Sequence, residues 1–443
     1  MAWDKLTLVT KTLPWFLPYL LRASIHRITA LFHKYSYKPT ENAKQVVVIG
    51  GSFAGLQIVH HLTESLPTGY KVVWIEKNSH LNFVFAFPRF SVVSGYEERA
   101  FIPYEGVENV APNGILTRIQ DRVVEVCDGY VKLASGQTVE YAYLAIATGA
   151  TRALPGQVVA TERADGAEEL RGVQGVIKES QRIAVVGAGA VGVELAADIK
   201  DVFPDKEVTL VHSRDGVLNR FGKRLQDYTL SALRDDLKVR VLLNERPKLP
   251  EGEALVKSST LQFSDGGTEE FDLIIRCTGQ TPNSSMLAPL YPTAISSSTS
   301  QILVKPTFQI DTSTSKSGEK SASDPRIFAF GDVAAHPGPL MARAGGSSPL
   351  FVRTGESETV AANILSLVKG QEAKAVYTPN MFVEGSIKLT LGRKRSVIYS
   401  SDPDGTEVLI EMGGGPEDMD VGRAWSQFGG VKEGKEKGKI KGN

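Results

Sequence analysis

One stretch constrains the fold of this chain more than any other, and it runs from Val46 to Glu76. Four apolar residues, 46–49, predict a buried parallel strand, and a second apolar run, 72–75, ends at Glu76. Between the two runs lies a glycine-rich turn formed by Gly50, Gly51, Ser52, Phe53, Ala54 and Gly55. A helix with apolar periodicity follows the turn. This order of strand, turn, helix and strand is that of a dinucleotide-binding βαβ unit.

Each part of such a unit serves the recognition of a dinucleotide. The glycines allow the backbone to approach a pyrophosphate, and the N-terminus of the helix supplies N–H donors and positive potential. Glu76 can accept hydrogen bonds from ribose hydroxyls. Ser52 stands where the middle glycine is usual, but its side chain is small enough to leave the approach of a phosphate open.

The same pattern occurs a second time. Apolar residues 183–186 precede a second turn, and apolar residues 208–211 follow it as the next strand. In this turn the residues that we assign to a dinucleotide site are Gly187, Gly189, Val191 and Gly192. A single glycine turn can be an ordinary strand-to-helix connection, whereas two complete units are hard to obtain by accident. The sequence therefore predicts two dinucleotide sites.

Composition and charge narrow the class of protein. With 443 residues, of which 42% are hydrophobic and 23% charged, the chain has room for two or three soluble globular domains. Its formal net charge is zero, so we expect no nucleic-acid partner. Its two cysteines, Cys127 and Cys277, are far apart and form no CxxC pair, so the sequence supports neither a structural metal site nor a redox-active disulfide.

Residues 1–43 differ in composition from the rest of the chain. Asp4 is the one acidic residue up to Lys38, against the basic residues Lys5, Lys11, Arg22, Arg27, Lys34 and Lys38. The apolar patch 13–21 is too short to span a bilayer, and Pro14 and Pro18 interrupt it. Beyond Pro18, one helical stripe consists of Leu21, Ile25, Ile28 and Phe32.

Three interpretations of this N-terminal segment compete. A basic amphipathic helix can lie in a membrane interface, so residues 1–40 could contact a membrane surface. An acid-poor segment containing arginine is also typical of mitochondrial targeting. In the third interpretation, the helix packs on the protein's own surface. The expected location is accordingly a membrane-associated site, either facing the cytoplasm or in a mitochondrion.

Later strands end in small-residue turns. Residues 143–149 predict a buried strand that ends in Thr148-Gly149, and residues 271–279 repeat this ending with Thr278-Gly279. A further apolar run leads to Gly331-Asp332. In the first half, Asp128-Gly129 predicts a hairpin turn between two short strands.

In combination these motifs resemble the apoptosis-inducing-factor-like and ferroptosis-suppressor-like flavoproteins, in particular the fungal members, which are related to type II NADH dehydrogenases. The resemblance covers roughly residues 44–400. It implies an α/β fold with two Rossmann-like dinucleotide-binding domains, as in pyridine nucleotide-disulfide reductases, and a small C-terminal α+β region. The implied divisions are an N-terminal segment 1–43, an FAD domain 44–155 with 270–370, an NAD(P)H domain 156–269, a C-terminal region 371–412 and a disordered tail 413–443. An exposed, mobile insertion is expected at 312–324.

By this resemblance the first unit binds FAD. The turn 50–55 would hold the pyrophosphate, Glu76 the adenosine ribose, and Thr148-Gly149 would close over the cofactor. The expected cofactor-binding set also includes Val123, Gly279 and Gly331.

Two charged residues have alternative roles. Asp332 would accept hydrogen bonds from the ribityl hydroxyls of FAD, and a helix N-cap is a role compatible with this one. Arg89 would pair with a phosphate or lie near the flavin edge, with a surface ion pair as the alternative.

The second unit would bind NADPH or NADH. No acid follows its second strand; instead Ser213 and Arg214 lie near the expected ribose, and an arginine there can accommodate the 2′-phosphate of NADPH. Ser213 and Arg214 therefore favour NADPH over NADH. Glu194, two positions after Gly192, would point toward the contact between nicotinamide and flavin and is the predicted catalytic residue, with simple burial in the helix as the alternative.

The predicted activity is that of an FAD-dependent NAD(P)H oxidoreductase. Without a cysteine pair the electrons cannot leave through a disulfide relay, so we expect a quinone-like or other small acceptor. A redox tailoring enzyme of small-molecule biosynthesis and an NAD(P)H-responsive redox signalling protein are the alternatives. Expected partners are the small-molecule acceptor, a membrane surface and a second copy of the chain in a homodimer.

Overall fold

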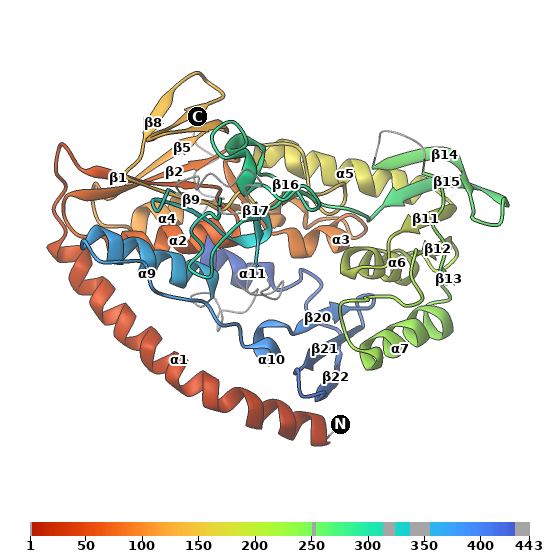
Figure 1. Ribbon diagram of the computed structural model, residues 1–443. Helices are drawn as coiled ribbons and strands as arrows, with labels where there is room; N and C mark the ends of the chain where they lie inside the picture. Colours follow the sequence, from red (N-terminus) through yellow and green to blue (C-terminus); the bar gives the residue numbers. More distant parts are fainter. Residues whose placement is uncertain (1, 250–253, 313–323, 337–354, 430–443) are drawn as a thin grey trace, which may run out of the picture.

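The computed structural model describes residues 2–249, 254–312, 324–336 and 355–429, and its first layer is a parallel sheet (Figure 1). The strands of this sheet, in spatial order, are β18 (Ile327–Ala329), β9 (Tyr143–Ile146), β1 (Lys44–Ile49), β2 (Tyr70–Glu76) and β5 (Leu116–Gln120). Alternate residues of β1 face opposite sides of the sheet. Val46 and Val48 belong to the core beneath α2 (Phe53–Thr63) and α9 (Glu356–Val368), whereas Val47 and Ile49 face the core on the other side.

The second layer is another five-stranded sheet with a similar arrangement, except that one of its edge strands is antiparallel. Its strands are β13 (Arg240–Leu242), β12 (Glu207–Val211), β11 (Arg182–Val186), β15 (Thr268–Arg276) and β14 (Leu255–Gln262). All neighbours are parallel except β14 and β15, which form an antiparallel pair. The helices of this part are α5 (Arg163–Glu179), α6 (Ala190–Val202) and α7 (Lys223–Ser231). The two strand–turn–helix–strand units predicted from the sequence are therefore confirmed.

The remaining elements are small sheets and short helices. The predicted hairpin at Asp128-Gly129 is confirmed, since the turn joins β6 to β7. The remaining pairs and meanders are β6 (Val123–Cys127), β7 (Tyr130–Leu133) and β8 (Thr138–Glu140); β3 (His80–Asn82) and β4 (Phe101–Pro103); β10 (Ala150–Thr151) and β16 (Thr281–Pro282); and β17 (Ile302–Leu303) and β19 (Ala334–Ala335). The short helices are α3 (Phe87–Phe90), α4 (Glu105–Val110), α10 (Met381–Glu384) and α11 (Val421–Ala424).

One predicted domain boundary needs correction. Residue 270, where we expected the second domain to end, lies inside β15. Because β15 pairs with β11 from Ile183–Leu273 to Val186–Arg276, the second sheet extends to Arg276. The pattern of residues 271–279 resembles that of residues 143–149 in the first sheet, but its strand, β15, belongs to the second sheet.

The C-terminal part is ordered further than we predicted. An antiparallel sheet of β20 (Ile387–Thr390), β21 (Arg395–Ser401) and β22 (Glu407–Gly413) is followed by α11. Val421, Trp425 and Phe428 are buried in the first core, so the predicted disorder is wrong for residues 413–429. Their spacing of four and three residues is a helical stripe that outweighs the preceding glycines. Residues 430–443, like most of the predicted insertion 312–324, lie outside the described residues.

The N-terminal segment forms one helix, α1 (Ala2–Ser36), along the outside of the molecule (Figure 1). The helix passes through Pro14 and Pro18, so the predicted interruption is wrong. Contacts with β22 and α10 hold its first half, and such tertiary packing can override the local cost of a proline. Among the described residues no helix combines the length and the apolar content needed to cross a membrane.

Candidate functional site

The first glycine turn closes tightly on its own backbone. Gly50 has φ +103°, in a region that favours glycine, and a Cβ atom there would lie 2.4 Å from the carbonyl oxygen of Ala147. A Cβ atom at Gly55 would lie 2.0 Å from the carbonyl oxygen of Gly50. The turn therefore needs glycine at both positions, which brings the start of α2 against the ends of β1 and β9.

The second glycine turn has the same geometry. Gly187 has φ +114°, and a Cβ atom at Gly192 would lie 1.9 Å from the carbonyl oxygen of Gly187. Gly189 is the N-cap of α6 with φ −76° and ψ −177°, and Ser52 is the N-cap of α2 with φ −77° and ψ −167°. Any residue can adopt this extended conformation, so the substitution of serine for the usual glycine leaves the backbone unchanged.

Both helices start without a capping side chain. Neither Ser52 nor Gly189 makes a side-chain hydrogen bond to its helix, although serine is a favoured N-cap residue. The first N–H groups of α2 and α6 therefore have no side-chain cap, as required if the pyrophosphate of a dinucleotide takes that place. These turns fit the phosphates of FAD and of NAD(P)H.

Glu76 lies at the end of β2, directly beside the first turn. Its carboxylate accepts hydrogen bonds from the backbone N–H of Gly51 and, at 2.8 Å, from that of Asn78. Burial raises the pKa of this carboxyl above its usual value, whereas the two N–H groups favour the ionised form. The placement suits an acceptor for the ribose hydroxyls of the first dinucleotide.

His212 takes the equivalent position in the second unit, and the sequence analysis did not assign it to the site. It follows β12 as Glu76 ends β2, and its Nδ1 atom lies 3.2 Å from the backbone nitrogen of Ala188. Its Nε2 atom lies 2.6 Å from Oδ1 of Asn219. With Nδ1 accepting from Ala188, Nε2 carries the proton and donates to Asn219. Aligning the two units at their strand ends would have identified this residue.

Ser213 and Arg214 follow His212 on the surface. Both side chains are exposed, and the carbonyl oxygen of Arg214 accepts a hydrogen bond of 2.9 Å from the N–H of Asn244. The backbone of the segment is thereby fixed while the guanidinium faces solvent. No ion pair holds this guanidinium within the described part of the chain.

The junction between the two layers carries the predicted small-residue turns. Thr148 Oγ1 donates to the carbonyl oxygen of Asn283 at 2.7 Å, and Asn283 Nδ2 donates to the carbonyl oxygen of Thr148 at 2.9 Å. Gly149 and Gly279 have φ +64° and +78°, which explains why glycine stands at both turns. The reciprocal bonds fix the first turn against the segment that follows the second sheet.

Asp332 is held by an arginine. Its Oδ2 atom lies 2.7 Å from a terminal nitrogen of Arg152. The alternative role as a helix N-cap is wrong, because the N-cap of the short 3₁₀ turn Gly331–Val333 is Phe330. Gly331 has φ +73°, and its N–H donates to the buried carboxylate of Glu356 at 2.6 Å. The predicted role of Asp332 toward a ribityl chain remains a prediction.

Arg89 forms a buried ion pair. Its Nε atom lies 2.8 Å from Oδ1 of Asp198 on α6, and its terminal nitrogen donates to the carbonyl oxygen of Gly392 at 2.9 Å. Both side chains are almost fully buried, so the alternative of a surface ion pair is wrong. The guanidinium joins helix α3 of the first domain, the second unit and the C-terminal sheet. Its role toward a phosphate or the flavin edge remains a prediction.

Glu194 lies one helical turn before Asp198 on the same helix. Its Oε1 atom accepts from the backbone N–H of Thr390 at 3.0 Å and from the hydroxyl of Thr390 at 3.1 Å. Burial, more than the neighbouring Asp198, raises the pKa of Glu194 to about 7. Burial likewise raises the pKa of Asp198 to about 6, against the effect of Arg89. The predicted catalytic carboxyl can therefore hold a proton near neutral pH.

Aromatic side chains surround the start of α2. The ring of Phe53 lies 5.1 Å from that of Phe85, 6.2 Å from that of Phe83 and 5.6 Å from that of Phe428, measured between centroids. Phe428 comes from the C-terminal segment that we had expected to be disordered.

Val123, at the start of β6, is buried in the core on the opposite side of the sheet.

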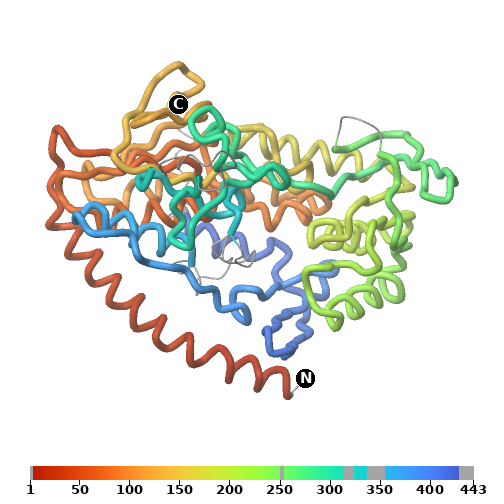
Figure 2. The backbone as a smooth tube through the Cα atoms, viewed as in Figure 1, coloured from red at the N-terminus to blue at the C-terminus, as the bar shows by residue number. Residues whose placement is uncertain are grey.

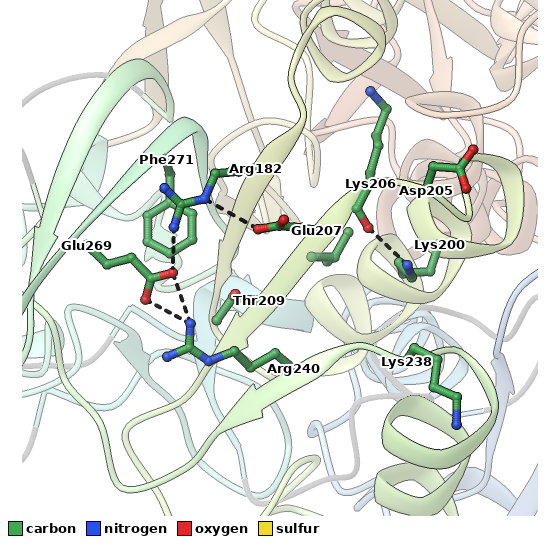
Figure 3. A pocket seen from close by; sticks show the side chains of 11 residues that line it. Arg182, Lys200, Asp205, Lys206, Glu207, Thr209, Lys238, Arg240, Glu269 and Phe271 are labelled. Atoms are coloured by element: carbon green, nitrogen blue, oxygen red, sulfur yellow. Dashed lines mark hydrogen bonds and ion pairs between the residues drawn. The ribbon is translucent and has the colours of Figure 1, made fainter.

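A cavity of about 270 Å³ lies elsewhere in the second layer (Figure 3). It is lined by Arg182, Glu207 and Arg240, the first residues of β11, β12 and β13. The glycine turn follows the opposite, carboxyl ends of these strands. Glu269 pairs with both arginines, at 3.0 Å to Arg182 and 2.8 Å to Arg240. The cavity is therefore separate from the dinucleotide site.

The sequence is similar to those of known proteins. The sequence pattern of the pyridine nucleotide-disulphide oxidoreductase family matches residues 44–359. Fe-regulated protein 8 of Mycosarcoma maydis is 31% identical over 416 residues, which are 87% of this chain and 95% of that protein. Ferroptosis suppressor protein 1 of Homo sapiens is 28% identical over 373 residues, which are 80% of this chain and 88% of that protein.

Solved structures show the same fold at low identity. The sulfide:quinone oxidoreductase of Aquifex aeolicus has a TM-score of 0.62 and 17% identity, covering 90% of this chain and 94% of that one. The water-forming NADH oxidase of Lactobacillus brevis has a TM-score of 0.56 and 19% identity, covering 81% and 75%.

Proposed function

Because the chain belongs to the pyridine nucleotide-disulphide oxidoreductase family, we propose that it takes a hydride from NADPH and reduces a quinone-like acceptor at a membrane surface. The family resemblance, the α/β fold with two Rossmann-like domains, and the cofactors FAD and NAD(P)H predicted from the sequence are confirmed. The nucleotide preference, the acceptor and the place of action are the proposed parts.

The observation that carries the proposal is the pair of uncapped glycine turns. At the N-cap positions Ser52 and Gly189, no side chain forms a hydrogen bond to the helix that follows. Each turn also has one polar side chain bonded to its backbone, Glu76 in the first unit and His212 in the second. Two such sites on one chain suit a bound flavin and an exchanging nicotinamide nucleotide. FAD, when bound, accepts the hydride of the nicotinamide and passes its electrons to the acceptor.

The residues after β12 support NADPH as the donor. In the first unit Glu76 offers a carboxylate to a ribose, and such a charge would repel a 2′-phosphate. In the second unit His212 takes that place, so the repulsion is absent. Arg214 then offers a planar fork of donors to the phosphate, and Ser213 one hydroxyl.

The proposal of a quinone-like acceptor rests on a carboxyl group in the site that can donate a proton. Reduction of a quinone by NADPH adds one hydride equivalent and one proton, which gives a hydroquinone and NADP⁺. Glu194 can supply the proton because its pKa is raised to about 7, and solvent then restores it. Cys127 and Cys277 are not joined in a disulfide, and burial raises the pKa of Cys277 to about 12, which disfavours a thiolate relay.

Spectroscopy of the purified holoprotein tests this function. Under anaerobic conditions NADPH should bleach the flavin absorbance, and a short-chain soluble quinone should restore it within the same turnover time. NADH should bleach it more slowly at equal concentration. A flavin that NADPH leaves oxidised would overturn the donor assignment, and a reduced flavin that the quinone does not reoxidise would overturn the acceptor assignment.

A further inference from the structure

The outward side of α1 is an apolar surface in which Thr10 and Ser24 are the exposed polar residues. Along its 35 residues the exposed large apolar side chains are Trp3, Leu6, Val9, Leu13, Leu17, Leu20, Leu21, Ile25, Ile28, Leu31, Phe32 and Tyr35. At roughly 100° per residue these positions fall within an arc of about 160° on the helix. Leu21, Ile28 and Phe32 are 64%, 57% and 72% exposed, so nothing in the described chain covers this face.

The inward side of α1 is attached to the body by polar contacts along its length. Asp4 pairs with Arg224 at 2.6 Å near the N-terminus, and Lys11 pairs with Asp402 at 2.6 Å. In the second half, other contacts join the helix to the first domain: His26 Nε2 to Glu64 at 2.5 Å, and His33 Nε2 to the carbonyl oxygen of Leu66 at 2.7 Å. The helix is therefore fixed in orientation along the outside of the molecule (Figure 2). Its apolar side chains are exposed, so they face away from the protein.

Charge on the outward side has one sign. Lys5 and Arg27 are exposed and fall along one border of the apolar arc. Lys34 lies on the same border, and its ammonium donates to the carbonyl oxygen of Val110 at 3.1 Å. The one carboxylate of α1, Asp4, lies on the inward side and is bound to Arg224. The outward face and its cationic border thus have no negative charge to pair with on the helix itself.

We propose that the outward face of α1 lies in the headgroup region of a membrane that contains anionic phospholipids. The apolar arc would enter the boundary of the acyl chains, and the cationic border would contact anionic headgroups. Trp3 and Tyr35, at the two ends of the helix, are residue types that favour the interface. This proposal deepens the proposed function by naming the surface at which the enzyme acts, and it stands without any assignment of the acceptor.

Charge complementarity favours lipid over a second copy of the chain. In a symmetric dimer each face would meet the same face, so cations would face cations or apolar residues without a carboxylate. Residues 430–443 are an equally poor cover, because they are rich in Gly, Lys and Glu and contain only Val431 and Ile440 as large apolar residues. An anionic bilayer offers both the apolar phase and the negative charge.

Vesicle flotation of the full-length holoprotein tests this proposal. Wild type should float with vesicles of phosphatidylcholine containing about a third phosphatidylserine, and much less with phosphatidylcholine alone. The double variant Leu17→Glu/Ile28→Glu, at the centre of the arc, should remain in the dense fraction with its flavin content and soluble-quinone turnover unchanged. The matched control Val124→Glu/Val159→Glu places the same charges on exposed valines away from α1 and should float like wild type.

A second variant examines the cationic border. Lys5→Gln/Arg27→Gln should reduce flotation with the anionic vesicles severalfold and should abolish its dependence on salt. Light scattering without vesicles then measures the molar mass in solution, which shows whether a second copy of the chain covers the apolar face instead. A wild-type dimer that Leu17→Glu/Ile28→Glu converts to a monomer would overturn the proposal in favour of a second copy. Equal flotation of wild type and this variant would also overturn it. Neither result depends on whether a quinone is the acceptor.

Discussion

The two dinucleotide units share a backbone but differ in side chains at the turn, on the following helix and after the second strand. The turns close in the same way, since a Cβ atom at Gly55 or at Gly192 would lie within 2.0 Å of the carbonyl oxygen of the first glycine of its turn. The residue bonded to the turn is Glu76 in the first unit and His212 in the second. Two further differences are Ser52 against Gly189, and Gln57 against Glu194.

This comparison separates what the fold needs from what the ligand needs. The glycines at the turns are required by the backbone itself, so they are the same in both units. The side chain after the second strand accepts a hydrogen bond from one backbone N–H of the turn in each unit, through a carboxylate in the first and an imidazole in the second. Differences of this kind are therefore where the specificity of each site resides.

The largest effect is expected from the same substitution in each turn. Gly55→Leu should prevent FAD from being retained, because its Cβ atom would collide with the carbonyl oxygen of Gly50 and open the turn. Gly192→Leu should leave the flavin bound but abolish its bleaching by NADPH, because only the second turn is opened. Flavin absorbance per polypeptide and anaerobic reduction measure both outcomes.

This pair of variants can contradict the assignment of the two sites. A yellow Gly55→Leu protein with normal flavin stoichiometry would show that the first turn does not hold FAD. Loss of flavin from Gly192→Leu alone would show that FAD binds at the second turn and NADPH at the first. Circular dichroism of both proteins checks that the rest of the fold survives.

The next effect concerns the residues after β12. Arg214→Ala should lower kcat/KM for NADPH by about tenfold, because a charge-assisted contact is worth roughly 1.5–3 kcal/mol when partly enclosed. The value for NADH, which lacks the phosphate, should fall at least about fivefold less. His212→Glu should act in the same direction and raise the use of NADH, because it installs the carboxylate of the first unit. Steady-state kinetics with both nucleotides measure this; equal losses would mean that Arg214 does not face the ribose.

A smaller effect is expected from making the second helix more like the first. Glu194→Gln introduces the amide found at Gln57. The pKa of Glu194 is raised to about 7, so wild type holds the proton below pH 7 and loses it as the pH rises through that value. Quinone reduction by wild type should therefore decline above pH 7, whereas the variant should be severalfold slower at pH 6 and nearly independent of pH. A variant that keeps the wild-type profile would remove Glu194 from proton transfer.

The sequence predicted the parts of this molecule that depend on local order. The strands flanking both turns and the turn at Asp128-Gly129 are predicted from periodicity and turn residues, and the structure contains each of them. Glu76 was found because its position follows from counting along one βαβ unit. The same count in the second unit ends at Ser213, one residue past His212, because the loop before the second strand differs in length; only the strand register aligns His212 with Glu76.

Three of the errors involve contacts between distant parts of the chain. The pairing of Arg89 with Asp198 joins residues more than a hundred positions apart, and no spacing rule predicts it. Residue 270 was placed in the wrong layer because β15 has the composition of a buried strand in either sheet. Trp425 is ordered because its indole N–H donates to the carbonyl oxygen of Arg99 at 2.8 Å, a partner that a glycine-rich tail gives no sign of.

The smallest effect is expected where the two units differ without consequence. Ser52 and Gly189 have the same extended conformation, and a Cβ atom at Gly189 would meet nothing within 4 Å. Ser52→Gly and Gly189→Ser should therefore each change nucleotide or flavin affinity by less than about twofold, because neither residue makes a cap whose loss would cost stability. Flavin retention after dialysis and the KM for NADPH measure the two sites separately. A large loss from Gly189→Ser would mean that the pyrophosphate of NADPH approaches that position more closely than the pyrophosphate of FAD approaches Ser52. The second turn would then bind its ligand in a different way from the first, despite the shared backbone.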